Sequence, residues 1–346
     1  MKPRPAPANP VPSFGFDSSG TSMEEALQVW RSSVQLLFDV EPDDSAPFHL
    51  AMHSYKIGPI LFGRTRSSAQ RFIRDEQVIA RGGDHHVLVQ LYVSGGYQGD
   101  AAGLPIRVRP GDICVLDLAA TFRTEAGAFD NLTMAVPRAL LGARLPNLDN
   151  LHGVVLPHDR GMTRLLGRHL LAIDEIAPEL EAPQADELVD ATLALLAATL
   201  VRAESGNGRG EAIDGSLPLA IRRHIDANLA DPALGASAIA RHFGVSRATL
   251  YRLFAGYGSI SDYIRRERLR RSLQDLRADT GKRAHVGRIA RRWGFGSDAS
   301  FARAFRATYG VSPTNARNIA EREVEGTPNT LVDWFSARDP SGPPGR

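Results

Sequence analysis

The sequence predicts a multidomain α+β protein, with an N-terminal β-barrel flanked by helices and a C-terminal all-α domain containing two helix-turn-helix motifs. Three observations lead to this prediction. Short apolar stretches cut by glycine and proline fill residues 48–137, helical periodicity fills most of the rest, and a motif recurs near the C-terminus. The length of 346 residues suits two domains, at roughly 150 residues each.

Charge divides the chain in the same way. Residues 217–325 carry 20 Lys and Arg against 10 Asp and Glu, whereas residues 1–216 carry 19 against 27. Such asymmetry favours a nucleic-acid-binding module joined to a different kind of domain. The single cysteine, Cys114, excludes an intramolecular disulfide and indicates a reducing, cytoplasmic location. No apolar run approaches the roughly 20 residues of a membrane-spanning helix, so we expect no membrane partner.

The first domain is predicted to span residues 20–203. Residues 1–19 are rich in proline and are expected to form a disordered leader. An amphipathic helix follows over 22–40, with Ser22 as its N-cap. The strands expected next are separated by glycine turns, which suits an antiparallel barrel: Val87–Val93, Ile106–Val108, Ile113–Leu118 and Leu132–Val136.

Two apolar helices, predicted at 160–176 and 185–203, complete this domain. They either cover the barrel or pair with a second subunit. Glycine-rich residues 204–216 are predicted to be a flexible linker. Residues 326–346 form a C-terminal tail of unknown role.

The domain at 217–325 contains an internal repeat. Its first copy reads Ile239-Ala240 and then Phe243-Gly244-Val245-Ser246, and its second reads Ile289-Ala290 and then Trp293-Gly294-Phe295. In each copy a glycine allows a sharp turn, and a serine (Ser246 or Ser297) follows as an N-cap. This pattern is typical of the helix-turn-helix motif, here repeated for a repeated task.

The second helix of each motif has an outward stripe. Apolar residues at i, i+3 and i+4 spacing face inward, namely Leu250, Leu253 and Phe254 in the first copy and Phe301 and Phe305 in the second. The outward positions are candidate DNA-binding residues: Arg247, Ala248, Thr249, Tyr251, Arg252, Asp298, Ala299, Ser300, Arg303 and Arg306. A helix over 261–277, roughly 25 Å long, would separate the two stripes by about one DNA turn.

Residues 217–319 resemble the C-terminal DNA-binding domain of AraC/XylS-type transcription regulators. The resemblance is carried by these stretches: Ser237–Ala240, Val245–Phe254, Ile289–Phe295, Phe301–Arg306 and Gly310–Pro313. It implies promoter DNA as a partner, with Arg252 and Arg303 reading base edges. Phosphate anchoring is the alternative for both arginines, and a helix-dipole role is the alternative for Asp298.

Residues 48–146 are similar to the cupin-like effector domain of larger members of that family. The similarity lies in Val89-Gln90-Leu91, the Gly95-Gly96 turn, Arg109–Asp112, Leu116-Asp117 and Val136–Arg138. It implies an activator that senses a small-molecule effector, forms a homodimer through the helices after the barrel, and contacts RNA polymerase.

The effector site is predicted from two kinds of residue. The inward faces of 87–97 and 113–122 are expected to line a pocket. A basic population could hold an anionic ligand, although surface ion pairing explains these residues equally well: Arg71, Arg74, His85, Arg109 and Arg123.

Neither catalysis nor a metal is predicted. His85 and His86 are adjacent and point to opposite faces of a strand, and His49 and His53 on a strand lie about 13 Å apart. No nucleophile elbow or phosphate-binding loop is present, so we expect no catalytic residues, metal or cofactor. Two alternatives stay open, namely a cupin-type enzyme with a DNA-binding tail and a constitutive DNA binder whose barrel only dimerises.

Overall fold

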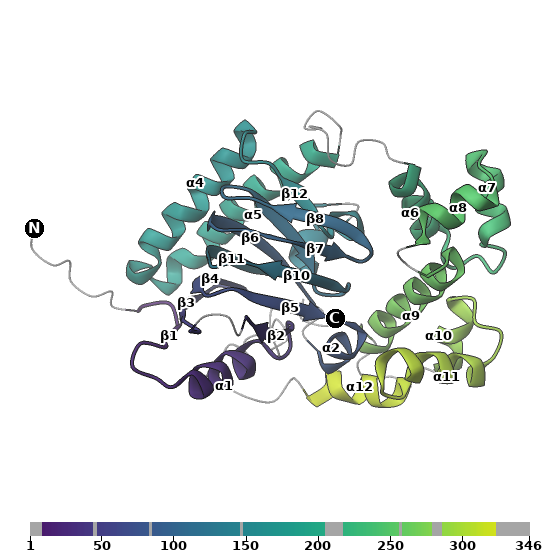
Figure 1. The fold of residues 1–346 in the computed structure, drawn as a ribbon, viewed down its shortest axis with the longest axis horizontal. Helices are drawn as coiled ribbons and strands as arrows, with labels where there is room; N and C mark the ends of the chain where they lie inside the picture. The colour runs from purple at the N-terminus through teal and green to yellow at the C-terminus, as the bar shows by residue number, and fades with distance from the viewer. Residues whose placement is uncertain are drawn as a thin grey trace, which may run out of the picture.

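The computed structural model describes residues 9–43, 47–82, 85–145, 148–204, 217–255, 258–278 and 286–322. A β-rich N-terminal part lies beside a helical C-terminal part, as Figure 1 shows. Three predictions fall wholly or partly outside the described residues. These are the leader over 1–8, the linker over 205–216 and the tail over 326–346.

The N-terminal strands form two antiparallel sheets rather than one closed barrel. The seven-stranded sheet has the order β1 (Ser13–Asp17), β3 (Leu50–Ile57), β4 (Ile60–Ser67), β11 (Phe129–Pro137), β6 (His86–Ser94), β9 (Ile113–Asp117) and β12 (Val154–Leu156). The five-stranded sheet has the order β2 (Asp39–Pro42), β5 (Gln70–Arg74), β10 (Phe122–Ala126), β7 (Tyr97–Ala101) and β8 (Leu104–Val108). The α+β class is confirmed, and the predicted barrel is corrected to two facing sheets.

The chain changes sheets at the Gly95-Gly96 turn between β6 and β7. Both glycines have positive φ, 72° and 153°. A Cβ on Gly95 would lie 2.3 Å from the carbonyl oxygen of Ala128, and one on Gly96 would lie 2.3 Å from that of Val108. Only glycine fits both the backbone conformation and this close approach, so the two glycines allow the chain to pass from one sheet to the other here.

The prediction of a disordered leader was wrong for its second half. Residues Ser13–Asp17 form strand β1 and pair with Tyr55–Ala51 of β3. Val11 is buried, and its amide donates to the carbonyl oxygen of Leu180 at 3.1 Å. Alternation of Phe14 and Phe16 with small or polar residues suits an edge strand, a pattern that the preceding prolines obscured.

Helices enclose the two sheets. Helix α1 (Met23–Val34) begins at Ser22, which forms a capping box with Glu25 as predicted, but it ends before β2 rather than at residue 40. Short helices follow at α2 (Glu76–Arg81), α3 (Arg138–Gly142), η1 (Leu148–Leu151) and η2 (Ala177–Glu179). Helices α4 (Gly161–Ile176) and α5 (Ala182–Glu204) bury their apolar faces against the seven-stranded sheet, which is the covering role left open above.

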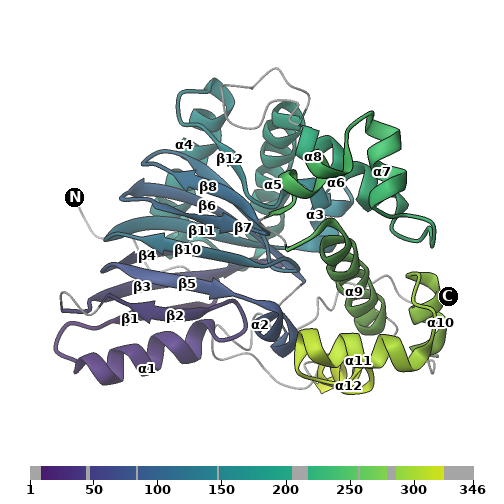
Figure 2. The same ribbon diagram turned by 45° about the vertical axis from the view of Figure 1, so that its right-hand side comes forward.

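The C-terminal part consists of helices. In order they are α6 (Leu217–Asn228), α7 (Ala236–Phe243), α8 (Arg247–Leu253), α9 (Ile260–Ala278), α10 (Val286–Arg292), α11 (Asp298–Tyr309) and α12 (Pro313–Arg322). One core joins α6, α7, α8 and the start of α9, and another joins the end of α9 to α10, α11 and α12. Helix α9 runs between the two motifs, as Figure 2 shows, which confirms the two helix-turn-helix units.

Candidate DNA-binding surface and effector pocket

The two helix-turn-helix motifs are built by the same local interactions. Gly244 and Gly294 end the first helix of each motif with φ of 64° and 74°. The next amide returns to the helix in both copies, from Val245 to the carbonyl oxygen of Ala240 at 3.0 Å and from Phe295 to that of Ala290 at 2.9 Å. The repeated sequence therefore encodes a repeated turn.

A serine caps each second helix. Ser246 Oγ accepts from the amide of Thr249 at 3.0 Å, and Ser297 Oγ accepts from the amide of Ser300 at 3.1 Å. The hydroxyls of Thr249 and Ser300 are themselves bonded within these caps, at 2.9 Å to Ser246 Oγ and at 2.8 Å to the Ser297 carbonyl oxygen. These two side chains are half-buried, so their structural role competes with base contact.

The other predicted DNA-binding residues are exposed on α8 and α11. Leu250, Phe254, Phe301 and Phe305 are buried in the two cores, as the helical spacing predicts. The opposite faces carry the exposed candidates: Arg247, Ala248, Tyr251, Arg252, Asp298, Ala299, Arg303 and Arg306. The structure thus presents two separate stripes that each contain two arginines.

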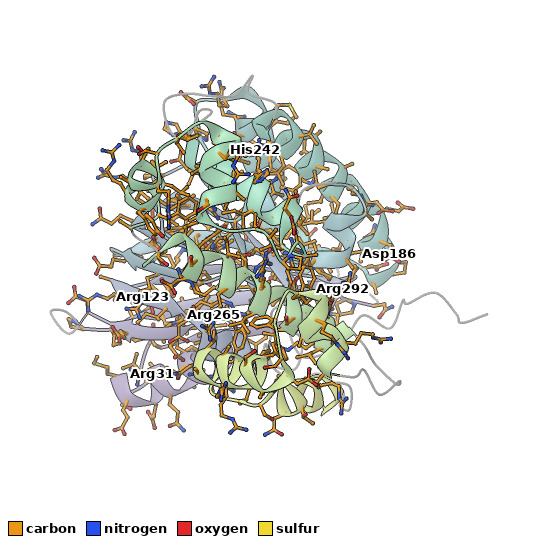
Figure 3. All side chains as sticks on the ribbon, turned by 90° about the vertical axis from the view of Figure 1, so that its right-hand side faces the viewer. Arg31, Arg123, Asp186, His242, Arg265 and Arg292 are labelled. Carbon is orange, nitrogen blue, oxygen red and sulfur yellow. The ribbon has the colours of Figure 1, made fainter. Side chains whose placement is uncertain are left out.

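Further basic side chains surround these stripes. Arg241, Arg288, Arg291 and Arg292 are exposed on α7 and α10. Arg292 lies 3.2 Å from Asp275 and 5.3 Å from the ring centroid of Trp293, so part of its charge is balanced locally. Figure 3 shows Arg265 of α9, Arg292 and His242 on the helical face of the molecule.

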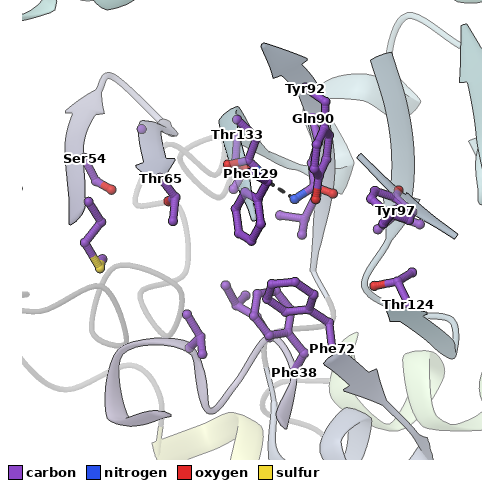
Figure 4. Close-up of a pocket in the computed structure, with 18 of the residues that line it drawn as sticks. Phe38, Ser54, Thr65, Phe72, Gln90, Tyr92, Tyr97, Thr124, Phe129 and Thr133 are labelled. Atoms are coloured by element: carbon purple, nitrogen blue, oxygen red, sulfur yellow. Dashed lines mark hydrogen bonds between the residues drawn. The ribbon is translucent and has the colours of Figure 1, made fainter. Parts of the chain in front are cut away.

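A pocket of about 780 Å³, including its mouth, lies between the two sheets beneath α1. Alternate residues of β3, β4, β6 and β11 form its floor, and β5, β7, β10, α1 and the segment after α1 complete the wall (Figure 4). The lining residues that carry polar groups or rings are Trp30, Phe38, Ser54, Thr65, Phe72, Gln90, Tyr92, Tyr97, Phe122, Thr124, Phe129, Asn131 and Thr133. The stretches 87–97 and 113–122 contribute to the lining as predicted.

The polar groups of the pocket are neutral. Gln90 Nε2 donates to Thr133 Oγ1 at 3.2 Å across neighbouring strands. Burial raises the pKa of Tyr92 and Tyr97 well above the usual value for tyrosine, and it raises the pKa of the nearby Cys114 thiol to about 12. None of the described residues that line the pocket is a Lys, Arg, His, Asp or Glu.

The comparisons with known proteins identify the family. Residues 28–201 match the AraC-binding-like domain family, and residues 239–319 match a helix-turn-helix domain family. The chain belongs to the AraC family of transcription regulators. As a member of this family, it is a DNA-binding regulator with a separate N-terminal effector domain.

Two similar proteins support this assignment. The transcriptional activator NphR from a Rhodococcus species is 26% identical over 297 residues, which are 84% of this chain and 88% of NphR. The crystal structure of the AraC-like transcriptional activator CuxR superposes with a TM-score of 0.52 at 20% identity, over 75% of this chain and 95% of that chain. The AraC-family chain therefore shares the CuxR fold across both domains.

The basic residues predicted to hold the effector do not line the pocket. Arg109 and Arg123 are exposed, and Arg71 pairs with Glu125 at 3.0 Å on the outer face of β5. His85 is half-buried just before β6. Arg74 is fully buried and donates to main-chain carbonyl oxygens. The geometry therefore corrects the expectation of an anion site formed by these five residues.

His53 lies in β3 and His86 in β6, whereas His49 and His85 each lie just before those strands. His49 Nδ1 lies 3.2 Å from Ser18 Oγ, and the His53 ring stacks on Tyr55 at 4.6 Å between centroids. Among the described residues, no three His, Cys, Asp or Glu side chains are grouped as a metal site. Of the helices that the structure describes, none has the length and apolar character needed to cross a bilayer.

Proposed function

We propose that this AraC-family regulator activates transcription from promoter DNA when a small molecule occupies the pocket between its sheets. One observation carries the proposal: two helices with exposed arginines lie in one domain, and the other domain contains a largely apolar pocket between its sheets. The activating sign follows the name of NphR, which describes a transcriptional activator. Cytoplasmic location fits a chain with its single cysteine buried and reduced.

Helices α8 and α11 are proposed to enter successive major grooves. Arg252 and Arg303 are the proposed base readers, since an arginine bidentate to guanine discriminates by about 1–3 kcal/mol. The two proposed stripes also include further residues, namely Arg247, Ala248, Thr249 and Tyr251 on α8 and Asp298, Ala299, Ser300 and Arg306 on α11. Arg288 and Arg291 would contact phosphates.

The DNA arm is tested by selecting operators from random duplexes with the full chain and then measuring variant affinities. Arg303→Ala should lower affinity for the selected operator and relax preference at one base pair. Arg288→Ala, the matched control on α10, should weaken binding to all sequences alike and reduce the slope against log salt by about one. Equal losses on all sequences for both variants would reassign Arg303 to phosphate contact.

The effector arm is tested by thermal unfolding of the full chain against a metabolite panel, followed by operator affinity with each stabilising compound. A ligand that binds only the folded domain raises the unfolding midpoint. Thr65→Phe, which places a ring in the pocket, should abolish that rise. If no compound changes operator affinity, the alternative of a constitutive DNA binder replaces this proposal.

A homodimer and contact with RNA polymerase complete the proposal. Leu165 and Ile176 on α4 are 52% and 45% exposed, and Val201 on α5 is 42% exposed. Exposed apolar side chains on the outer face of α4 suit a helix pair that meets its copy. Leu165→Glu should shift the chain toward monomer in sedimentation velocity while leaving its folding intact.

A further inference from the structure

We infer that the pocket takes an uncharged planar aromatic molecule that carries a single hydrogen-bonding group, such as a phenol. This inference rests on the proposed effector role of the pocket. It is carried by three features of the lining: the absence of charged groups, a shell of aromatic rings, and a buried amide oxygen without a hydrogen-bond partner among the described residues.

The absence of charge sets the first limit on the ligand. The polar groups that line the pocket are hydroxyls, amides and the indole of Trp30, and burial keeps both tyrosines protonated. An ionised carboxylate or phosphate placed here would lose its hydration without gaining a cation, which is strongly unfavourable. The pocket therefore favours neutral ligands.

The aromatic shell sets the second limit. Phe38 meets Phe72 edge to face at 5.0 Å and Phe122 at 6.2 Å, and Phe72 meets Phe129 at 6.0 Å. Trp30 extends the shell from α1, lying 6.3 Å from Phe38. Such edge-to-face clusters accept one more ring with favourable geometry, so a flat aromatic body matches the wall.

An unpartnered acceptor sets the third limit. Asn131 Oδ1 has no hydrogen-bond partner among the described residues, although the side chain is only 4% exposed. Gln90 and Thr133 are already bonded to each other, and the Tyr97 hydroxyl has the Cys114 thiol as a partner. One open acceptor suits a ligand with one hydroxyl that donates to Asn131, whereas a sugar would leave several of its own hydroxyls unmatched.

The test uses calorimetry with the full chain to compare three probes that share a methyl-substituted benzene ring and differ in the para group: 4-methylphenol, 4-methylanisole and 4-methylbenzoate. We expect the phenol to bind roughly 5- to 10-fold more tightly than the ether, which cannot donate, and the benzoate to bind most weakly. Asn131→Leu should remove the phenol's advantage and keep ether binding. Thr133→Val, a control on the same strand and the same face, should keep the tighter binding of the phenol over the ether. If Asn131→Leu does not fold, Asn131→Ser takes its place.

Tight binding of the benzoate, or a phenol advantage that survives in Asn131→Leu, would overturn this ligand class. If none of the probes binds while another compound of the metabolite panel stabilises the chain, the class is wrong but the effector pocket stands. If no compound binds at all, the proposed effector role fails as well.

A second inference comes from different contacts, those between the two domains. We propose that α2 of the N-terminal domain couples the pocket to the second helix-turn-helix unit. Ile79 and Ala80 of α2 are each 3% exposed and pack in one core with Leu276, Phe305 and Tyr309 of the C-terminal domain. Figures 1 and 2 both place α2 against this end of the helical part.

Two buried arginines donate to the C-terminal end of α2, Arg277 to its last turn and Arg74 to the carbonyl oxygen of its C-cap, Gly82. Arg277 of α9 is 1% exposed, and its Nη2 donates to the carbonyl oxygens of Ile79 and Ala80 at 3.0 Å each. Arg74 of β5 follows pocket residue Phe72 by two positions, and it donates to the carbonyl oxygen of Leu37, beside Phe38, at 2.6 Å. A ligand that separates Phe38 from Phe72 therefore moves the strand that leads into α2, and with it the support of α11.

A double-mutant cycle tests this coupling without requiring a known ligand. Phe72→Leu alters the pocket wall, and Ile79→Ala trims the contact between α2 and α11. Affinities for the selected operator should be non-additive for this pair by at least about 2-fold. Arg265→Met, an exposed change on α9, should combine additively with Phe72→Leu. The coupling would be overturned if the effect of Phe72→Leu on operator affinity added to that of Ile79→Ala just as it adds to that of Arg265→Met, or if Phe72→Leu had no effect at all. Ile79→Val replaces Ile79→Ala if the alanine variant does not fold.

Discussion

Arg74→Met should destabilise the N-terminal domain strongly, because Arg74 is a fully buried donor to several main-chain carbonyl oxygens. Its guanidinium donates to the carbonyl oxygens of Leu118 at 2.7 Å, Leu36 at 2.8 Å and Leu37 at 2.6 Å, with a longer bond to Gly82 at 3.4 Å. Methionine fills the space of the aliphatic stem but leaves these carbonyls without that donor. At roughly 1–1.5 kcal/mol for each of the three short bonds, the loss is about 3–5 kcal/mol.

Urea unfolding of the full chain, followed by tryptophan fluorescence, measures the effect. At about 2 kcal/mol per molar urea, the midpoint of the N-terminal transition should fall by about 2 M. Arg71→Met is the matched control, because Arg71 lies on the same strand with its side chain 63% exposed and paired with Glu125 at the surface. That control should lose less than about 1 kcal/mol. Similar midpoints for the two variants would refute the assignment of Arg74 as the central hydrogen-bond donor of this domain.

Three further predictions concern pH and capping. Burial lowers the pKa of His152 to about 3 from 6.5, so the folded state disfavours the charged form of this histidine. The free energy of unfolding should therefore fall as pH drops below 6.5, by up to about 1.4 kcal/mol per pH unit. In urea titrations at several pH values, His152→Asn should flatten this dependence. Burial and, to a smaller extent, the charge of Glu267 raise the pKa of Asp226 to about 7 from 3.8. The folded state therefore favours the protonated carboxyl, and the stability this provides is lost as pH rises from 3.8 to 7. Asp226→Asn should be more stable than the parent at about pH 8, and the difference should shrink at about pH 5. Ser297→Ala should cost about 1 kcal/mol in thermal unfolding and weaken operator binding, and unchanged stability would show that the cap is dispensable.

The sequence predicted the helical domain well because its signals are local. A glycine that needs positive φ and a serine that caps a helix act within a few residues, so Gly244, Ser246, Gly294 and Ser297 fix the motifs wherever the rest of the chain lies. The inward positions of α8 and α11 follow from helical spacing alone. The sequence alone therefore predicts which residues of α8 and α11 form the two exposed stripes.

The pocket was harder to predict because it forms between strands that are distant in sequence. Basic residues were predicted to bind the effector, but Arg71 faces outward and pairs with Glu125, and Arg74 donates its hydrogen bonds to main-chain carbonyl oxygens. A better signal was present in the alternation of the strands. Ser54, Thr65 and Asn131 occupy inward positions where a filled core would have apolar side chains, and such substitutions mark a cavity rather than a core.

The position of β1 bears on how this pocket can vary. Strand β1 belongs to the seven-stranded sheet and β2 to the five-stranded sheet, and the segment 18–38 between them carries Trp30, Val34, Leu37 and Phe38 over the pocket. The segment that covers the pocket is thus joined to the seven-stranded sheet at its N-terminal end and to the five-stranded sheet at its C-terminal end. Insertions or deletions within 18–38 can deepen or shorten the binding space while every strand keeps its register, so ligand preference can change in this segment independently of the scaffold that carries it.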